Sequence, residues 1–406
     1  MEYGYTLRLL KSIVFMKLGL TFLAVILTIL STNAQDIQEN NEFHPNFTFA
    51  GRLMFDYGSF DYKNEPDISF TGTEIRRATL ESFGELSKNI GFKFQIDFAR
   101  TVFKFKEVNI YFKDIPVIGG RLTIGNVLVP FNLDKITSSK FITFMERATP
   151  AYYMFMFKTG FLYENFNIWK NRIGFQIAYT ANGEQIRGIN YHLTEGQNLT
   201  TRFTLNTFER PSRNEVLHLG FSFTHKEPVK IDDAPDKIYA IAVRPEADMA
   251  RVSLFHVFHD VNEVLIGGLE AAYTIGSFSV QGEVVNASIS TINGRSYVPS
   301  YYGYVSYFLT GEHRPRSSKN AFGRVKPIKE FNFKDQWGAV ELAARYSSFD
   351  LTTVDQGKLN DFTFGVNWYL TSYARVMYNY IYSNNPGIET VNMHMIRFQI
   401  DFAKKF

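Results

Sequence analysis

The C-terminal stretch of the chain reads Met393-His-Met-Ile-Arg-Phe-Gln-Ile-Asp-Phe-Ala-Lys-Lys-Phe406. Apolar side chains recur at alternate positions, with Lys404 as the one exception. The apolar positions are Ile396, Phe398, Ile400, Phe402 and Phe406, and the polar ones are Arg397, Gln399, Asp401 and Lys405. Because successive side chains of a β-strand point to opposite faces, this pattern predicts a strand with one apolar and one polar face.

A strand of a soluble β-sandwich would alternate in the same way. Two details favour instead the last strand of an outer-membrane β-barrel: the apolar face is rich in aromatic residues, and a terminal phenylalanine completes it. The last strand of such a barrel must pair with the first, because an unpaired edge is very costly in lipid. We therefore expect Phe398, Ile400, Phe402 and Phe406 to form an assembly signal for the barrel-assembly machinery.

The N-terminal region has the features of a secretory signal peptide. Lys11 and Lys17 precede an uncharged apolar run from Leu18 to Leu30, and the small residue Ala34 follows. This order is typical of export signals, and the run is too short to span a membrane comfortably as a helix. We assign residues 1–34 to the signal peptide, with Met16 as an alternative start, residues 35–46 to a disordered leader and residues 47–406 to the barrel domain.

The composition narrows the class of protein further. The 406 residues include no Cys, which excludes disulfides and thiolate chemistry, and 16% are aromatic, with 40 Phe and 23 Tyr. Mean hydropathy is only −0.15, because the polar lumen face of barrel strands offsets the apolar lipid face. The formal net charge is +3, so any ion preference must come from the positions of the charges. Nothing in the sequence implies a cofactor.

Period-two segments extend along the chain. The first is expected at 47–57, and the most regular one at 90–98 alternates phenylalanines with Lys93, Gln95 and Asp97. Further strands are expected at 76–81, 108–112 and 121–125, around Phe161, and at 173–180, 202–207, 217–224, 238–243, 265–275, 278–285, 301–309, 340–346, 362–370 and 374–382. Irregular stretches at 129–158 and 310–335 interrupt the pattern, and such stretches are usually functional. The spacing predicts an all-β, antiparallel transmembrane barrel of about 16 to 18 strands.

Several motifs together resemble those of the phosphate-selective porin O and P family. They are Thr143-Phe-Met-Glu-Arg-Ala148, Tyr307-Phe-Leu-Thr-Gly-Glu-His-Arg-Pro315, Trp337-Gly-Ala-Val-Glu-Leu-Ala-Ala-Arg-Tyr-Ser347 and Val366-Asn-Trp-Tyr369. The resemblance implies a 16-stranded porin of the Gram-negative outer membrane, usually a homotrimer, with an inward-folded loop that narrows an anion-preferring pore. By position, the segment from Val129 to Pro150 resembles that constriction loop. Arg76 and Arg77 match a paired arginine at the start of the family's second strand.

The sequence departs from the phosphate-specific members in one respect. Those members carry arginines at alternate positions, as Arg-x-Arg-x-Arg, whereas the nearest run in this chain is Arg314-Pro-Arg316. Such a ladder passes an anion between close sites that bind strongly enough to admit it and weakly enough to release it. We therefore expect passive diffusion of small hydrophilic solutes with a preference for anions, among which phosphate and polyphosphate are candidates.

The charged residues in the two irregular stretches are the candidate pathway residues. The 311–335 stretch carries seven Lys or Arg residues against three acidic ones, although it could also be a solvated extracellular loop that faces lipopolysaccharide phosphates. In the constriction segment, Arg147 could contact ions or could pair with Glu146 and fix the loop. The predicted ion pathway comprises Arg76, Arg77, Lys135, Lys140, Arg147, Arg314, Arg324 and Lys326.

Other functions fit the sequence less well. His256 and His259 lie three positions apart, which on a strand places their rings on opposite faces, so we expect no metal site. Asp232, Asp233 and Asp236 could bind calcium in a loop, but an acidic turn beside Lys230 and Lys237 explains them better. The alternatives to a porin are a barrel with a plugged lumen that serves adhesion or support, and a phospholipase-type barrel enzyme. We expect no enzyme activity and no nucleic-acid partner; the expected partners are outer-membrane lipid, lipopolysaccharide and small anions.

Overall fold

The computed structural model describes residues 43–99, 103–153, 156–180, 193–194, 196–231, 236–251, 254–317, 321–386 and 389–406. The predicted signal peptide and most of the predicted leader lie outside the described residues. No helix in the described ranges is long and apolar enough to cross a membrane.

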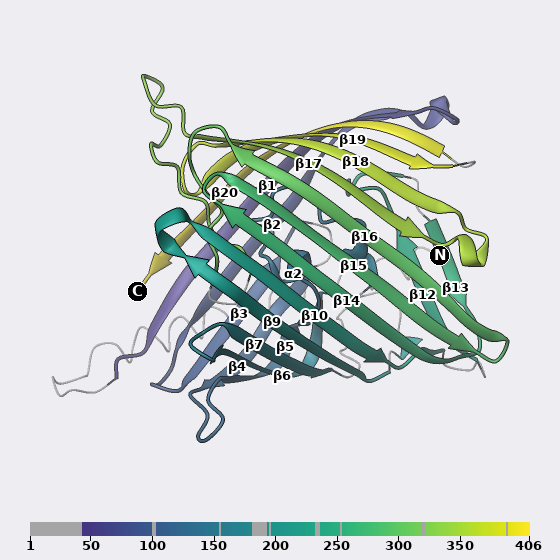
Figure 1. Ribbon diagram of the computed structural model, residues 1–406, viewed down its shortest axis with the longest axis horizontal. Helices are drawn as coiled ribbons and strands as arrows, with labels where there is room; N and C mark the ends of the chain where they lie inside the picture. Colours follow the sequence, from purple (N-terminus) through teal and green to yellow (C-terminus); the bar gives the residue numbers. More distant parts are fainter. Residues whose placement is uncertain are drawn as a thin grey trace, which may run out of the picture. The chain divides into compact units, whose positions relative to one another are not determined.

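The wall of the structure is a closed antiparallel barrel of sixteen strands (Figure 1). Each strand pairs with its neighbour in the chain, and the last pairs with the first. The strands are β1 (Asn46–Tyr62), β2 (Phe70–Glu85), β3 (Ile90–Asp97), β4 (Lys104–Lys113), β5 (Arg121–Leu128), β6 (Phe157–Ile168), β7 (Ile173–Thr180), β9 (Asn198–Arg210), β10 (Glu215–Lys226), β14 (Val261–Ile275), β15 (Phe278–Thr291), β16 (Gly294–Phe308), β17 (Ala339–Asp350), β18 (Lys358–Tyr369), β19 (Ala374–Asn385) and β20 (Glu389–Lys405). The predicted fold class and strand number are confirmed.

The C-terminal strand β20 has the two faces that its sequence predicts. Phe398 and Ile400 are 53% and 57% exposed on the outer surface, whereas Arg397 is 1% exposed on the lumen side. Strand β20 pairs with β1 from Thr48↔Lys405 to Tyr62↔Val391, which closes the barrel. At the end of this seam the rings of Phe47 and Phe406 stack, with their centroids 5.3 Å apart.

A charged residue on the outer face should destabilise the barrel. We expect Phe398→Arg to lower the free energy of unfolding by about 2–4 kcal/mol, because the arginine would face hydrocarbon near mid-membrane. The loss would appear as a lower temperature at which the folded band disappears in semi-native gel electrophoresis. Phe398→Leu, which keeps an apolar outward side chain, is the matched control. Equal melting of the arginine and leucine variants would contradict the assignment of the faces.

A β-bulge in β2 explains how two consecutive arginines can both face the lumen. The register of β1 and β2 shifts at this point, so that Met54 pairs with Arg77, Phe55 pairs with Ile75, and Arg76 is the extra residue. A bulge reverses the alternation of side chains along the strand. Because β2 begins at Phe70, the arginine pair lies in the middle of this strand, which corrects the expectation that it lies near the strand's start.

The two ends of the barrel differ in their connections. We call one end of the barrel the short-turn end. The first strand begins there at Asn46 and the last strand ends there at Lys405. This end carries the turns 86–89, 114–120, 169–172, 211–214, 276–277 and 370–373. The opposite, long-loop end carries the long connections 129–156, 181–197 and 227–260. Short turns face the periplasm in barrels of this class. The 309–338 insertion joins β16 to β17 at the short-turn end, which corrects the alternative that it is an extracellular loop.

A second, small sheet lies within the long-loop connections. Its strands, in spatial order, are β13 (Leu254–Phe258), β12 (Lys237–Val243), β11 (Val229–Ile231) and β8 (Leu193–Thr194). The segment 238–243 was expected as a strand of the regular array, but it belongs to this sheet. Apolar side chains of β12 and β13 pack in one buried cluster with residues of β14, β15 and the 129–153 segment, so the small sheet covers part of the lumen.

Candidate functional site

The irregular segment 129–153 folds into the barrel, as the constriction loop was predicted to do. It contains the one-turn helix α2 (Leu133–Ile136) and the 3-10 turn η2 (Thr149–Tyr153). Lumen-facing side chains from strands on opposite sides of the barrel hold its backbone. The hydrogen bonds run from Asn132 N to Ser222, Leu133 N and Asp134 N to Glu283, Asn367 to Thr143 O, Arg375 to Ile142 O, and Gln399 to Lys140 O. The loop therefore crosses the lumen and narrows it.

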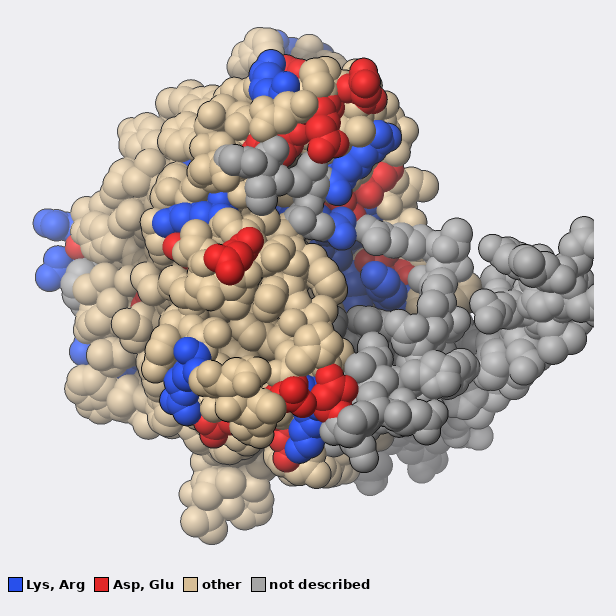
Figure 2. Space-filling model, turned by 90° about the vertical axis from the view of Figure 1, so that its right-hand side faces the viewer, with Lys and Arg blue, Asp and Glu red and all other residues tan. Residues whose placement is uncertain are grey.

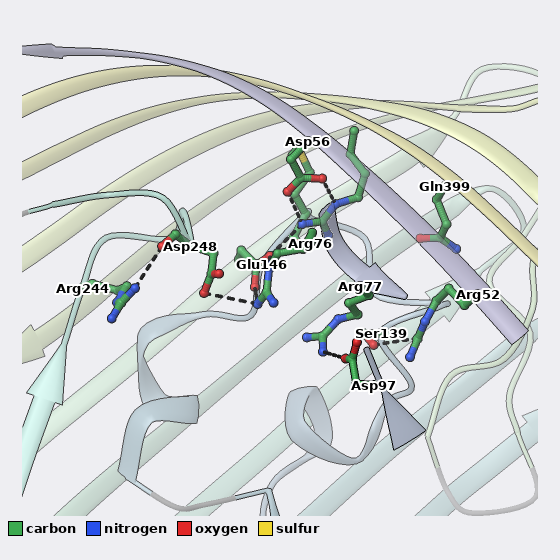
Figure 3. Close-up of polar contacts among 12 residues, drawn as sticks. Arg52, Asp56, Arg76, Arg77, Asp97, Ser139, Glu146, Arg244, Asp248 and Gln399 are labelled. Atoms are coloured by element: carbon green, nitrogen blue, oxygen red, sulfur yellow. Dashed lines mark hydrogen bonds and ion pairs between the residues drawn. The ribbon is translucent and has the colours of Figure 1, made fainter. Parts of the chain in front are cut away.

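Glu146 is the ionic anchor of the constriction loop (Figure 3). Arg76 on β2 donates to both of its carboxylate oxygens, at 2.7 and 2.8 Å, and Arg397 on β20 donates to Oε1 at 2.7 Å. Arg397 also pairs with Asp56 on β1, so one network joins the loop to the seam of the barrel. Burial acts to raise the pKa of Glu146, but the attraction of Arg76 and Arg397 outweighs burial and holds this pKa well below its ordinary value.

Arg147 stabilises the constriction loop through backbone carbonyl groups and not through the ion pair with Glu146 that the sequence suggested. It does not pair with Glu146; it donates to the backbone carbonyl oxygens of Asp134 at 2.9 Å and Thr137 at 2.7 Å. Carbonyl oxygens carry no net charge, so these bonds orient the guanidinium group without neutralising it. Arg147 therefore combines a positioning role in the loop with a positive charge in the lumen.

Lys135 and Lys140 have different surroundings within the loop. Lys135 is 3% exposed, its ammonium group donates to Ala151 O at 2.9 Å, and burial lowers its pKa well below the ordinary value. Lys140 forms an ion pair with Glu81 on β2, which offsets its charge. Both contacts stabilise the loop, and the assignment of these lysines to the ion pathway stays a prediction.

Four cations gather where the constriction loop approaches β1, β2 and β4. This cationic cluster consists of Arg52, Arg77, Lys106 and Arg147; Arg52 and Arg77 lie within electrostatic reach of each other and of the other two. Asp97 on β3 lies 2.6 Å from the ammonium group of Lys106 and 3.8 Å from Arg77. Asp97 thus stands between two of the cations, and Glu81, Glu146 and Asp401 also lie within electrostatic reach of the cluster. Figure 2, which views the long-loop end, shows Lys and Arg side chains gathered at the edge of a hollow.

Two members of the cationic cluster, Arg52 and Lys106, were not among the pathway residues predicted from the sequence. Arg52 donates to Ser139 of the constriction loop at 2.8 Å, and Lys106 donates weakly to Thr79 at 3.4 Å. The available signal was parity, because Arg52 lies on the polar face of the first expected strand. Lys106 gave no such signal, because it falls outside the strand expected at 108–112.

The 309–338 insertion also enters the lumen, from the short-turn end. Its inner limb, residues 312–325 without the undescribed 318–320, buries Ala321 and Phe322 against Leu133 and Ile136 of helix α2. The two irregular segments therefore meet inside the barrel. The outer limb, residues 326–337, carries Lys326 at an exposed position and the 91% exposed Phe333.

The arginines of the inner limb contact the wall and the constriction loop. The guanidinium group of Arg314 lies 3.9 Å from the ring centroid of Phe322 and donates to the hydroxyl of Tyr304. Arg324 lies 2.7 Å from Asp401 on β20, and its guanidinium group lies 5.1 Å from the ring centroid of Phe141 in the loop. Both arginines are thus placed on the short-turn side of the constriction.

A third segment, residues 244–251, folds inward from the long-loop end. Its Glu246 accepts hydrogen bonds from Arg345 at 2.8 Å, Ser347 at 2.6 Å and Thr363 at 2.7 Å. Arg345 on β17 therefore forms an ion pair with this inward-folded segment. Asp248 lies 3.5 Å from Arg76, which links the segment to the anchor of the constriction loop (Figure 3).

The residues considered for metal binding are not gathered into a site. His259 Nδ1 lies 2.8 Å from Asp236, His256 packs against the ring of Phe258, and Asp232 and Asp233 lie outside the described residues. In the part of the chain that the structure describes, no three His, Cys, Asp or Glu side chains are arranged to hold a metal ion.

A closed sixteen-stranded barrel with an apolar outer face and a loop folded across a polar lumen defines the protein as an outer-membrane porin, which is a channel protein. The chain belongs to the phosphate-selective porin O and P family, whose model matches residues 47–402. No curated protein sequence matches it.

Solved porin structures share the fold at low sequence identity. The anion-selective porin from Comamonas acidovorans is 12% identical, with a TM-score of 0.57, over 89% of this chain and 100% of that chain. OmpF of Salmonella typhi, in complex with daunomycin, is 9% identical, with a TM-score of 0.55, over 88% and 97% of the two chains. The trimer form of Vibrio cholerae OmpT is 10% identical, with a TM-score of 0.53, over 89% and 100%.

Proposed function

We propose that this porin passes small hydrophilic solutes by diffusion and prefers anions. The observation that carries the proposal is the cationic cluster of Arg52, Arg77, Lys106 and Arg147 beside the constriction loop. Water is scarce there and the walls have a low dielectric constant, so each charge acts on a passing ion more strongly than it would at an open surface. Rings of Arg and Lys side chains are how anion pores of this kind select.

The comparisons support an anion preference without specifying phosphate. The matching family is described as phosphate-selective, and the Comamonas acidovorans porin is described as anion-selective. This chain lacks the Arg-x-Arg-x-Arg ladder, and its cations come from β1, β2, β4 and the constriction loop. We therefore propose general anion selectivity, with phosphate and polyphosphate among the permeant ions.

Bilayer recordings test this proposal. With the purified porin in a planar bilayer and a tenfold gradient of KCl, the reversal potential should have the sign of chloride preference. The preference should weaken in concentrated salt, because screening lengths shorten. A reversal potential with the sign of potassium preference would refute the proposed selectivity. A complete absence of conductance would favour the plugged barrel that serves adhesion or support.

We assign the pathway residues of the sequence distinct parts in this function. Arg76 positions the constriction loop through Glu146, and Lys140 does so through Glu81. Arg77 and Arg147 present charge to the permeant ion, and buried Lys135 holds the loop through its hydrogen bond to Ala151 O. Arg314 and Arg324 act on the short-turn side of the constriction, whereas exposed Lys326 acts only on ions approaching from the periplasm.

We propose that the chain reaches the outer membrane after cleavage of residues 1–34 and assembles there as a homotrimer within lipid and lipopolysaccharide. The trimeric Vibrio cholerae OmpT supports this oligomeric state by its shared fold. The aromatic outer face of the strands suits contact with lipid.

Deletion of Phe406 tests the proposed assembly signal formed by Phe398, Ile400, Phe402 and Phe406. The Phe406 backbone N–H donates to Phe47 O at 2.9 Å, and their rings stack, so the deletion removes contacts at the closing seam. We expect a chain that is exported and cleaved near Ala34 but accumulates in the periplasm. Phe406→Tyr, which keeps an aromatic ring, is the matched control. Normal outer-membrane levels of the deletion variant at equal expression would contradict the role of Phe406.

A further inference from the structure

A cavity of about 200 Å³ lies inside the barrel on the short-turn side of the constriction loop. Strands β2 to β7 form its wall, and Ile136 of helix α2 closes the side toward the constriction. The cavity is separate from the cationic cluster, none of whose members lines it. A solute passing the constriction therefore meets a second, different environment.

Cations are the accessible charged groups of this cavity. Lys93 pairs with Glu107, and Arg121 pairs with Glu164. The side chains of Lys93 and Arg121 are 27% and 29% exposed, against 15% and 5% for the two glutamates. Lys93 and Arg121 are thus the more accessible partners of these two pairs, and the cavity offers their donors to a solute. Arginine can bind a carboxylate through two parallel hydrogen bonds.

The rest of the cavity lining is mixed: Asn109, Thr123 and Gln176 are polar, and five side chains are apolar. Val127 and Leu162 belong to one buried apolar cluster, and Leu128, Ile136 and Phe83 also line the cavity. Phe83 is 36% exposed although its position in β2 faces the lumen, so its ring is available to a solute. An inorganic anion would contact only the charged side of such a cavity. A solute with a hydrocarbon body would also remove this apolar surface from water.

We propose that this cavity is a binding subsite for small organic carboxylates that carry an apolar body. The carboxylate binds Arg121 and Lys93, and the apolar body packs against Leu162, Val127 and Ile136. The subsite rests on the proposed function, because solutes reach it through the pore. It adds a substrate class that the cationic cluster alone would not favour over chloride.

Calorimetric titration of the detergent-purified porin tests the subsite independently of conduction. Phenylacetate is the probe, acetate lacks the apolar body, and phenylacetamide lacks the carboxylate. We expect phenylacetate to bind with a Kd at least tenfold below that of acetate, which corresponds to about 1.4 kcal/mol. Phenylacetamide should bind as weakly as acetate, because it cannot pair with Arg121.

Three variants separate the contributions of the cavity. Arg121→Gln should abolish the preference for phenylacetate over phenylacetamide, and Arg121→Lys should restore part of it. Leu162→Asn should bring the phenylacetate and acetate affinities together. Lys88→Gln, which removes an exposed cation from the neighbouring 86–89 turn, is the charge-matched control and should bind as the wild type does.

Two results would overturn the proposal: equal affinities for phenylacetate and acetate in the wild type, or phenylacetamide binding as tightly as phenylacetate. A porin that binds phenylacetate but conducts no chloride would refute the proposed function and leave the subsite in place. A porin that conducts chloride with the anion preference but shows no preference among the three probes would refute the subsite alone.

Discussion

Deletion of residues 312–337 is expected to raise the single-channel conductance several-fold. This deletion removes the inner limb of the insertion, whose Ala321 and Phe322 pack against helix α2 and occupy the lumen on the short-turn side of the constriction. It joins Gly311 to Gly338, whose φ angles are +95° and +72°. Two residues with positive φ are what a tight two-residue β-hairpin turn requires, so β16 and β17 can remain paired.

Two controls make this experiment decisive. Phe333→Ser changes the exposed outer limb only and should leave the conductance at the wild-type value. The folded band in semi-native gel electrophoresis should persist in the deletion variant, because the barrel wall keeps all sixteen strands. A correctly folded deletion variant with wild-type conductance would show that the inner limb does not limit the passage of ions.

The barrel was predictable because its wall follows a local rule. Alternation along β20 assigned Phe398 to lipid and Arg397 to the lumen without knowledge of any partner strand, and the structure agrees. The same rule fails at the bulge in β2. There Arg76 and Arg77 are adjacent in sequence yet both face the lumen, and alternation would have sent one of them into lipid. A bulge depends on the register with the neighbouring strand, which is a non-local property.

The site was less predictable because its contacts join distant parts of the chain. Glu146 and Arg147 were adjacent and of opposite charge, which favoured a local ion pair. In the structure Glu146 pairs with Arg76 and Arg397, which lie far from it in sequence, and Arg147 turns to backbone carbonyls. The end of the barrel at which the 309–338 insertion lies was also hard to predict. Successive strands run in opposite directions, so this end depends on the number of strands that precede the insertion. One segment wrongly assigned as a barrel strand therefore moves the insertion to the opposite end.

Reversal of charge at Arg52 and Arg77 should convert the pore from anion to cation preference. Arg52 donates to Ser139, which is neutral, and Arg77 forms only a long ion pair, at 3.8 Å, with Asp97. Arg52→Glu with Arg77→Glu replaces two positive charges by two negative ones, so the four cluster positions together become neutral and the neighbouring Asp97 makes the local sum negative. The new carboxylates can pair with these two cations, which limits the cost to folding.

The reversal potential in a KCl gradient measures this change directly. It should switch sign in the double glutamate variant and move toward zero in the double glutamine variant, Arg52→Gln with Arg77→Gln. Both effects should shrink in concentrated salt as screening lengths shorten. Lys326→Glu with Lys329→Glu makes the same charge change on the exposed outer limb and should shift the potential much less. A larger shift from this outer pair than from Arg52 and Arg77 would place the selective charges at the short-turn mouth and not at the cationic cluster.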